Sequence, residues 1–267
     1  MSGLDVTALL AAYDAQLRAN PPDKLPEGAR AERDGPLVRY IGFPHGGFVD
    51  YRDLGEIRDD QVDALIARQV QVFAARGDPF EWKLHEHDRP ADLAERLVAS
   101  GLIPEARETV MIAPVATVAT DPMLSGGVTL LEVTERNDLD RIAEMERAVW
   151  HEDRSWLAES LEAERRVDPD ALTIVVAEAT GTVVCAAWVR FVGGTEFATL
   201  WGGATLEEWR GRGIYRAIVA YRANLAAARG FRYLQVDASD DSRPILSRLG
   251  FVAVTTTTPY VWSPPSS

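Results

Sequence analysis

The stretch Arg210-Gly211-Arg212-Gly213-Ile214-Tyr215-Arg216 decides how this chain is interpreted. It follows a strand expected over residues 196–205 and opens a helix expected to end at Arg229, where Gly230 is a natural stop. The first turn of a helix leaves backbone N–H groups without partners, and the helix dipole adds positive charge there. Glycines admit a ligand close to the backbone. The stretch predicts an anion cradle of pyrophosphate size; the alternative is an ordinary turn with solvated arginines.

The elements around this stretch alternate between strands and helices, which predicts a mixed α/β fold. Val, Ile and Thr enrichment and turn glycines mark the strands, and capping residues mark the helices. The expected order is a strand at 129–133, two helices to about residue 166, an antiparallel meander over 172–205, a helix to 229, a strand at 232–237, a helix at 241–249 and a strand at 252–262.

Two motifs in this order resemble the GCN5-related N-acetyltransferase (GNAT) family. The pattern from Arg210 to Gly213 resembles its acetyl-CoA loop, although Tyr215 departs from the usual small last residue. The ending Ser242-x-x-Ile245-Leu246-x-x-Leu249-Gly250-Phe251 resembles its fourth-helix motif. The resemblance covers about residues 129–262. It implies a mixed, mostly antiparallel twisted sheet flanked by helices, with acetyl-CoA as the co-substrate and no metal.

The resemblance also implies which residues hold the co-substrate. Backbone amides from Gly211 to Tyr215 would bind the pyrophosphate, and the strand end at 204–206 would pair with the pantetheine arm. Arg216 is a candidate for the remaining phosphate or, equally, a solvated helix residue. The expected cofactor-binding residues are Ala204, Thr205, Leu206, Arg210, Gly211, Arg212, Gly213, Ile214, Tyr215, Arg216 and Ser242.

The catalytic residues are less well marked. Family members often carry a glutamate on the strand before the loop as a base, and this strand offers Glu196, which is otherwise a solvated strand-entry residue. Glu152 and Asp153, between the two helices, are alternatives. The family's usual acid is a tyrosine at the position of Leu246, which cannot donate a proton. Either Tyr260 or Tyr215 supplies the proton, or water does, or the domain binds acyl-CoA without much turnover.

An internal echo predicts a second domain of related structure. Ala74-Ala75-Arg76-Gly77 returns as Ala227-Ala228-Arg229-Gly230, and each copy precedes a strand, an Arg-Pro pair and a helix. We expect a degenerate GNAT-like domain at 1–115, a linker at 116–127, an acyl-CoA-binding GNAT domain at 128–263 and a tail at 264–267. The first half lacks the phosphate loop, since Asp59 and Asp60 stand at its helix start and repel phosphate. We therefore expect it to bind no CoA.

Composition limits the partners. The 267 residues carry a formal net charge of −13, so nucleic acid is not expected, and no apolar run reaches membrane-spanning length. The single cysteine, Cys185, suits a reducing compartment, and we expect a cytoplasmic protein. The predicted function is N-acyl transfer from acetyl-CoA, by direct transfer in a ternary complex, to a small-molecule or peptide amine. The rival classes are a non-catalytic acyl-CoA-binding or sensor module and an interaction scaffold; the oligomeric state stays open.

Overall fold

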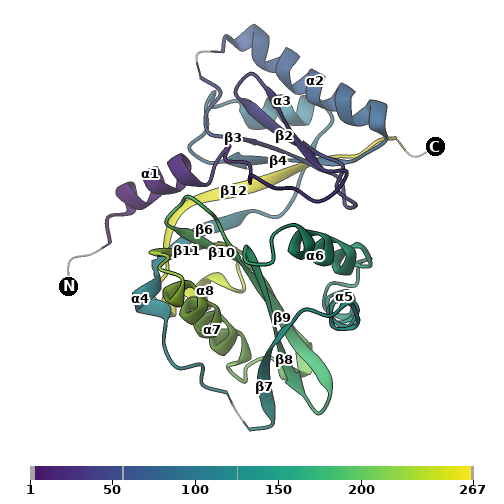
Figure 1. Cartoon of the computed structure of the whole chain (residues 1–267). Coiled ribbons are helices and arrows are strands. Elements are labelled where there is room, and N and C mark those ends of the chain that lie inside the picture. The colour runs from purple at the N-terminus through teal and green to yellow at the C-terminus, as the bar shows by residue number, and fades with distance from the viewer. Residues whose placement is uncertain (1–3, 56, 125, 266–267) are drawn as a thin grey trace. The chain divides into compact units, whose positions relative to one another are not determined.

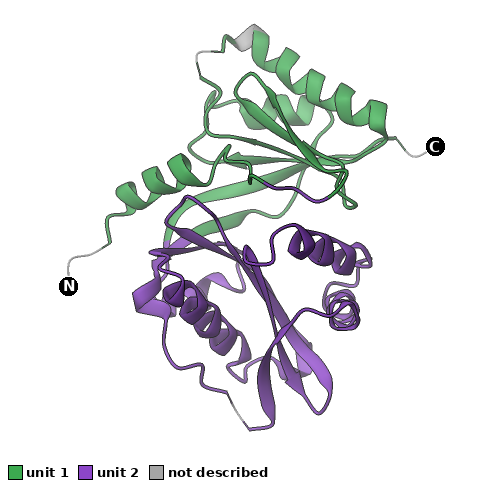
Figure 2. Cartoon of the chain, viewed as in Figure 1, with its two compact units in different colours: residues 1–23, 27–110, 253–267 green, residues 24–26, 111–252 purple. Residues whose placement is uncertain are grey.

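The computed structural model describes residues 4–55, 57–124 and 126–265 of the chain. Its contacts divide the chain into two compact units (Figure 2). Unit 1 comprises residues 1–23, 27–110 and 253–267, and unit 2 comprises residues 24–26 and 111–252. Both ends of the chain therefore belong to unit 1.

Unit 1 is a mixed sheet with helices. In chain order it contains α1 (Val6–Gln16), β1 (Arg30–Asp34), β2 (Leu37–Ile41), β3 (Gly47–Tyr51), α2 (Asp59–Arg76), β4 (Phe80–His85), α3 (Leu93–Ala99), β5 (Ile103–Pro104) and β12 (Val252–Trp262). The sheet order is β1-β2-β3-β4-β12, with β5 pairing to β12 off this path. Only β3 and β4 are parallel neighbours, and α2 makes the crossover that parallel strands need.

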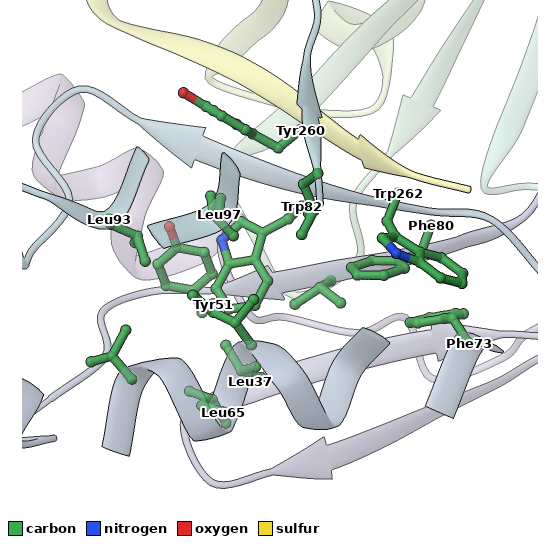
Figure 3. Close-up of a cluster of buried hydrophobic side chains, with 14 of the residues drawn as sticks. Leu37, Tyr51, Leu65, Phe73, Phe80, Trp82, Leu93, Leu97, Tyr260 and Trp262 are labelled. Atoms are coloured by element: carbon green, nitrogen blue, oxygen red, sulfur yellow. The ribbon is translucent and has the colours of Figure 1, made fainter. Parts of the chain in front are cut away.

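The C-terminal strand β12 completes the core of unit 1. It runs antiparallel to β4, with Trp262 opposite Phe80 and Tyr260 opposite Trp82. Trp262 joins a buried aromatic group in which Phe73 stacks on Phe80 at 4.4 Å between ring centroids (Figure 3). Burial of large aromatic side chains is a major stabilising contribution, so unit 1 depends on the last strand of the chain.

Unit 2 is a twisted, mostly antiparallel sheet with helices on both faces (Figure 1). In chain order its elements are β6 (Glu108–Pro114, from Met111), α4 (Val115–Val118), β7 (Val128–Val133), α5 (Arg136–Trp150), α6 (Trp156–Val167), β8 (Leu172–Ala179), β9 (Thr182–Phe191), β10 (Phe197–Thr205), the 3₁₀ turn η1 (Glu207–Trp209), α7 (Ile214–Ala228), β11 (Tyr233–Ala238) and α8 (Arg243–Arg248). Strands β7 to β11 are ordered β11-β10-β9-β8-β7, and only β10 and β11 are parallel.

Two apolar clusters attach the helices to this sheet. One packs α5 and α6 on β8 and β9, with Ile142, Leu161 and Trp188 among its members. The other packs α7 and α8 on the opposite face, with Val219 and Leu246 among its members. Within the sheet, the parallel β10–β11 pair thus packs against α7 and α8, and α7 begins in the sequence expected to bind the co-substrate.

The units divide the chain differently from the expected domains. Residues 253–263, expected at the end of the second domain, lie in unit 1. Residues 116–127, expected as a linker, fall within unit 2, where Val115 and Val118 of α4 lie in a core cluster. Ser266 and Ser267 of the expected tail lie outside the described residues. None of the described helices is both long and apolar enough to cross a membrane.

We predict that Trp262→Ala destabilises unit 1 by about 3–5 kcal/mol, because it leaves a cavity in the buried core of that unit. Hydrogen–deuterium exchange of β4 peptides measures this as a lower free energy of opening. Trp150→Ala, which removes a half-exposed tryptophan of unit 2, is the control and should leave β4 exchange unchanged. Equal β4 exchange in Trp262→Ala and wild-type protein contradicts the prediction.

Candidate functional site

The loop between η1 and α7 has the backbone of an anion cradle. Gly211 and Gly213 adopt φ of 73° and 78°, the left-handed region that glycine enters freely. Gly213 is the N-cap of α7, and its carbonyl accepts the first helical hydrogen bond, from Ala217 at 3.0 Å. Within the described part of the chain, the N–H groups of residues 214–216 have no acceptor, and no side chain caps the helix. Three donors therefore point out of a helix N-terminus.

Three arginines surround these donors. Arg210 donates Nε to the Thr205 carbonyl at 3.0 Å, which ties the loop to the end of β10. Arg212 stacks on Trp209, with its guanidinium carbon 4.6 Å from the ring centroid. Neither these two nor Arg216 forms an ion pair with a carboxylate among the described residues. In a chain with a net charge of −13, this concentrates unneutralised positive charge where the helix dipole is also positive.

Strand β10 leaves its neighbour β11 halfway along. The two pair only from Phe197 opposite Tyr233 to Thr199 opposite Gln235, while β10 continues to Thr205. A bulge at Gly202–Ala204 marks this free half. Such parting of parallel strands leaves backbone groups of β10 available to another partner.

Of residues 204–206 at the end of β10, only Thr205 turns its backbone groups away from β9. Leu206 donates its N–H to Val184 at 3.0 Å, so Leu206 and, two residues earlier, Ala204 turn their backbone groups toward β9. Thr205 lies between them and faces away from β9. Its carbonyl already accepts from Arg210, which leaves its N–H. Of the three residues expected to pair with the pantetheine arm, Thr205 is therefore the one whose backbone N–H is available.

Tyr215 lies beneath the bulge. A Cβ on Gly203 would lie 2.6 Å from Cε2 of Tyr215, so glycine is required there for the ring to pack. Burial raises the pKa of Tyr215, while the positive charge of Arg222 and an interaction with Ser242 act to lower it. Ser242 is the N-cap of α8 and donates its hydroxyl to the Ser239 carbonyl at 3.2 Å. Leu246, at the family's tyrosine position, is wholly buried in the core. The phenol of Tyr215 therefore lies near the helix from which the family's tyrosine is missing.

Arg222, on α7, is a buried cation that sequence reasoning missed. It is 1% exposed and donates to the carbonyls of Ile218, Trp188 and Trp201 at 3.2, 3.0 and 2.9 Å. The described residues supply it with no carboxylate, and burial lowers its pKa to about 10. Its only sequence signal is an arginine within an otherwise apolar helix face. It places an uncompensated positive charge behind the free half of β10.

The two residues expected to be catalytic belong to different units of the chain. Glu196 forms an exposed ion pair with Arg232 at 3.0 Å, and its carbonyl accepts the N–H groups of Arg232 and Tyr233. This is the joined end of the β10–β11 pair, about 20 Å along the strand from Gly202. Tyr260 belongs to unit 1, where it lies in the aromatic core. The roles of Glu196 as the base and Tyr260 as the acid stay predictions.

The alternative acidic residues have local partners. Glu152 pairs with Arg154 at 2.8 Å, and Asp153 accepts the N–H of Ser155 at 2.9 Å, as in an Asx turn before α6. Glu146 on α5 is buried, accepts from Trp150 Nε1 at 2.7 Å, and has its other oxygen without a hydrogen-bond partner. Burial raises the pKa of Glu146. It is the one carboxyl of the three held in an apolar setting.

Unit 1 repeats the parted strands but fills the gap with its own side chain. β3 and β4 pair in parallel from Gly47 opposite Phe80 to Val49 opposite Trp82 and then separate. Arg18, from the segment after α1, donates to the Tyr51 carbonyl at 3.0 Å and to Asp88 at 2.7 Å. Asp88 also accepts from the Tyr51 hydroxyl at 2.5 Å. The gap is thus occupied by a buried ion pair.

Two histidines of the first half, His85 and His87, have local partners. His85 shares a hydrogen bond with the Tyr13 hydroxyl, and His87 contacts Asp14. Over residues 4–55, 57–124 and 126–265, no group of three or more His, Cys, Asp or Glu side chains could hold a metal ion. The helix α2 begins with two acidic residues in sequence, Asp59 and Asp60, after the N-cap Arg58.

Comparison with known proteins identifies the second half. Residues 137–251 match the model of the acetyltransferase (GNAT) family. No curated protein matches the chain.

Solved structures resemble the whole chain. A GCN5-related N-acetyltransferase from Kribbella flavida is 17% identical with a TM-score of 0.68, covering 100% of this chain and 98% of that one. A conserved protein of unknown function from Staphylococcus epidermidis is 14% identical with a TM-score of 0.65, covering 91% and 96%. A tandem GNAT protein from the clavulanic acid biosynthesis pathway is 17% identical with a TM-score of 0.63, covering 98% and 96%.

These likenesses confirm the expected fold class, two GNAT-like domains, and the family match falls on the segment that holds the cradle, the bulged β10 and the parted strands. Residues 137–251 of this chain therefore form a GNAT-type N-acetyltransferase domain.

Proposed function

We propose that unit 2 transfers an acetyl or short acyl group from acetyl-CoA to an amine by direct transfer in a ternary complex. The observation that carries this proposal is the uncapped N-terminus of α7, with three arginines that no carboxylate of the described chain neutralises, at the end of a strand that has left its neighbour. Free amides and positive charge suit a diphosphate, and an unpaired strand end suits an amide-containing arm.

In this proposal the backbone binds most of the co-substrate. The amides of Gly211 to Tyr215, with that of Arg216, hold the pyrophosphate, and the Arg216 guanidinium meets the remaining phosphate. The N–H of Thr205 donates to the pantetheine arm. Arg210 acts through the strand, since its bond to the Thr205 carbonyl fixes the loop against β10.

The chemistry requires a neutral amine and a leaving thiolate. The amine nitrogen attacks the thioester carbonyl, the C–N bond forms, the C–S bond breaks and the amine loses a proton to solvent. We assign the proton donor for the thiolate to Tyr215, because its buried phenol stays protonated at neutral pH and lies by α8. The fixed charge of Arg222 stabilises negative charge as it develops on the oxygen and sulfur atoms. The acidic surface favours a cationic small-molecule or peptide amine.

A non-catalytic acyl-CoA-binding module is the rival function. Leu246 favours it, because that side chain cannot donate a proton. The position of Tyr215 favours the enzyme, since it supplies a phenol from α7 in place of the one absent from α8.

We further propose that unit 1 binds no acyl-CoA. Its strand gap is filled by Arg18, whose charge is neutralised by Asp88, and its crossover helix starts with two acidic residues. Burial alone would raise the pKa of Asp88, but hydrogen bonds from His85 and Tyr51 and the charge of Arg18 outweigh it and hold the pKa at about 2. The pair is thus ionised and in place at neutral pH.

The cradle is tested by Gly213→Asp and Gly213→Asn. Asn and Asp have the same shape and both tolerate a positive φ, so the variants differ only in charge. Calorimetry should show one acetyl-CoA per wild-type chain. Gly213→Asp should bind at least about tenfold more weakly than Gly213→Asn, because a carboxylate beside the diphosphate repels it. Equal affinities, or two equivalents of acetyl-CoA per chain, contradict the proposal.

The proton donor is tested by Tyr215→Phe, which keeps the ring against Gly203 and removes only the hydroxyl. We expect kcat to fall by about 10²-fold, with little change in the affinity for acetyl-CoA. Tyr221→Phe is the matched control on the same helix; its hydroxyl bonds to Glu132 on the surface, and kcat should stay the same. An unchanged kcat in Tyr215→Phe rules out this role.

The filled gap of unit 1 is tested by Arg18→Met, which leaves Asp88 buried without its cation. We expect the free energy of opening of β3 and β4 to fall by about 3–5 kcal/mol, measured by hydrogen exchange. Adding Asp88→Asn to Arg18→Met should recover part of this loss. If the effects of the two single variants simply add in the double variant, Arg18 and Asp88 are not coupled. Because folding lowers the pKa of Asp88, its contribution is present above about pH 4 and is lost as the pH falls toward 2.

A further inference from the structure

Unit 1 contains a cavity that the proposed function does not use. It has a volume of about 400 Å³, within the range of small-molecule sites. It lies between the end of β4, the loop to α3 and the strand β12, and all of its lining residues belong to unit 1. Its surface has an apolar floor, a hydroxyl-bearing wall and a cationic rim.

The floor is apolar and fixed. Leu84, Leu93 and Ala94 line the cavity. Leu93 is 1% exposed within the core cluster of unit 1, and Leu84 and Ala94 pack against that cluster. The floor therefore keeps its shape without a ligand, which lowers the cost of binding an apolar group.

The wall comes from one face of β12. Thr256, Thr258 and Tyr260 occupy alternate positions, so their side chains share a face of the strand. Among the described residues, the hydroxyls of Thr258 and Tyr260 form no hydrogen bond. In Figure 3 the Tyr260 oxygen lies at the end of the ring away from the packed tryptophans. Burial raises the pKa of Tyr260, so the phenol remains a donor at neutral pH.

At the rim of the cavity, more of the positive charge than of the negative charge lacks an opposite partner. Arg89 donates to the Asp88 carbonyl at 2.9 Å, and no carboxylate of the described chain pairs with it. Arg107 donates to Thr256 at 3.1 Å and lies 3.8 Å from Glu86, a loose exposed pair. The charge of Asp88 is already matched by Arg18 at 2.7 Å. The Arg89 guanidinium is thus a free cation at the mouth of an apolar hole, in a chain of net charge −13.

The deep side of the cavity adds no charge. His85 lines it from the end of β4, and burial lowers the pKa of this imidazole, which is therefore neutral. A cationic ligand would meet Arg89 and the loosely paired Arg107 and Glu86 at the entrance, and the buried carboxylate of Asp88 is already bound by Arg18. An anionic ligand would meet the guanidinium groups first and the two hydroxyl donors next.

We propose that this cavity is a binding site for a small carboxylic acid with a compact apolar body. The carboxylate is held by Arg89, with the hydroxyls of Thr258 and Tyr260 as further donors, and the apolar body lies on Leu84, Leu93 and Ala94. Unit 1 is then a ligand-binding domain joined to an acetyltransferase domain, with a site separate from acyl transfer.

The test uses the full chain in the absence of acetyl-CoA, with phenylacetate as the probe. Binding is measured by ligand-observed NMR titration. Phenylacetamide, of the same shape but uncharged, should bind at least about tenfold more weakly. Arg89→Gln should weaken phenylacetate by a similar factor. Arg243→Gln is the matched control, because Arg243-Pro244 in unit 2 is the sequence echo of Arg89-Pro90, and it should leave phenylacetate binding unchanged.

A second variant tests the cavity independently, and binding of acetyl-CoA by unit 2 shows that this variant is still folded. Ala94→Phe fills the floor and should abolish phenylacetate binding while the affinity of unit 2 for acetyl-CoA stays the same. The proposal is overturned if phenylacetate and phenylacetamide bind equally, if Arg89→Gln binds phenylacetate as the wild type does, or if neither phenylacetate nor hexanoate shows saturable binding up to about 20 mM.

Discussion

The parting of two parallel strands is the constraint on which both units depend. Backbone N–H and C=O groups removed from water need partners, and a strand that leaves its neighbour loses them. In unit 2 the carbonyl of Trp201 is satisfied by Arg222 and that of Thr205 by Arg210. In unit 1 the carbonyl of Tyr51 is satisfied by Arg18. Both units thus solve the same backbone problem with arginine side chains, which reach a carbonyl from outside the strand.

The two solutions differ in charge. The charge of Arg18 is neutralised by Asp88. The gap between β3 and β4 of unit 1 is therefore filled and carries no net charge from this pair. Arg222 is held by carbonyl dipoles alone, and its charge remains uncompensated within the described structure. A fixed cation in a low-dielectric site acts strongly on negative charge that forms nearby and needs no reorganisation at that moment. In the proposed function, this difference in charge is what suits unit 2, and not unit 1, to acyl transfer.

The sequence was sufficient for the features that are local. The glycines and arginines of 210–216 lie at a helix start as predicted, because positive φ and free amides are properties of a few consecutive residues. Arg222 escaped notice because its burial depends on carbonyls that β9 and β10 bring to it. Arg18 was missed for the same reason. The sequence also could not predict that β12 belongs to unit 1. The alternation of side chains along a strand indicates its two faces but not which strands it pairs with.

The proposed proton donor, Tyr215, lies at a different position from the tyrosine of the family pattern. Leu246 packs in the apolar cluster beneath α7 and α8. A polar side chain at this position would leave a polar group without a hydrogen-bond partner in that core. The residue that departs from the family loop, Tyr215, occupies the space opened by the missing side chain of Gly203 and extends toward Ser242. A small residue at 215 would leave that space empty. Under the proposed function, the two departures from the family pattern compensate each other: α7 supplies the phenol that α8 lacks.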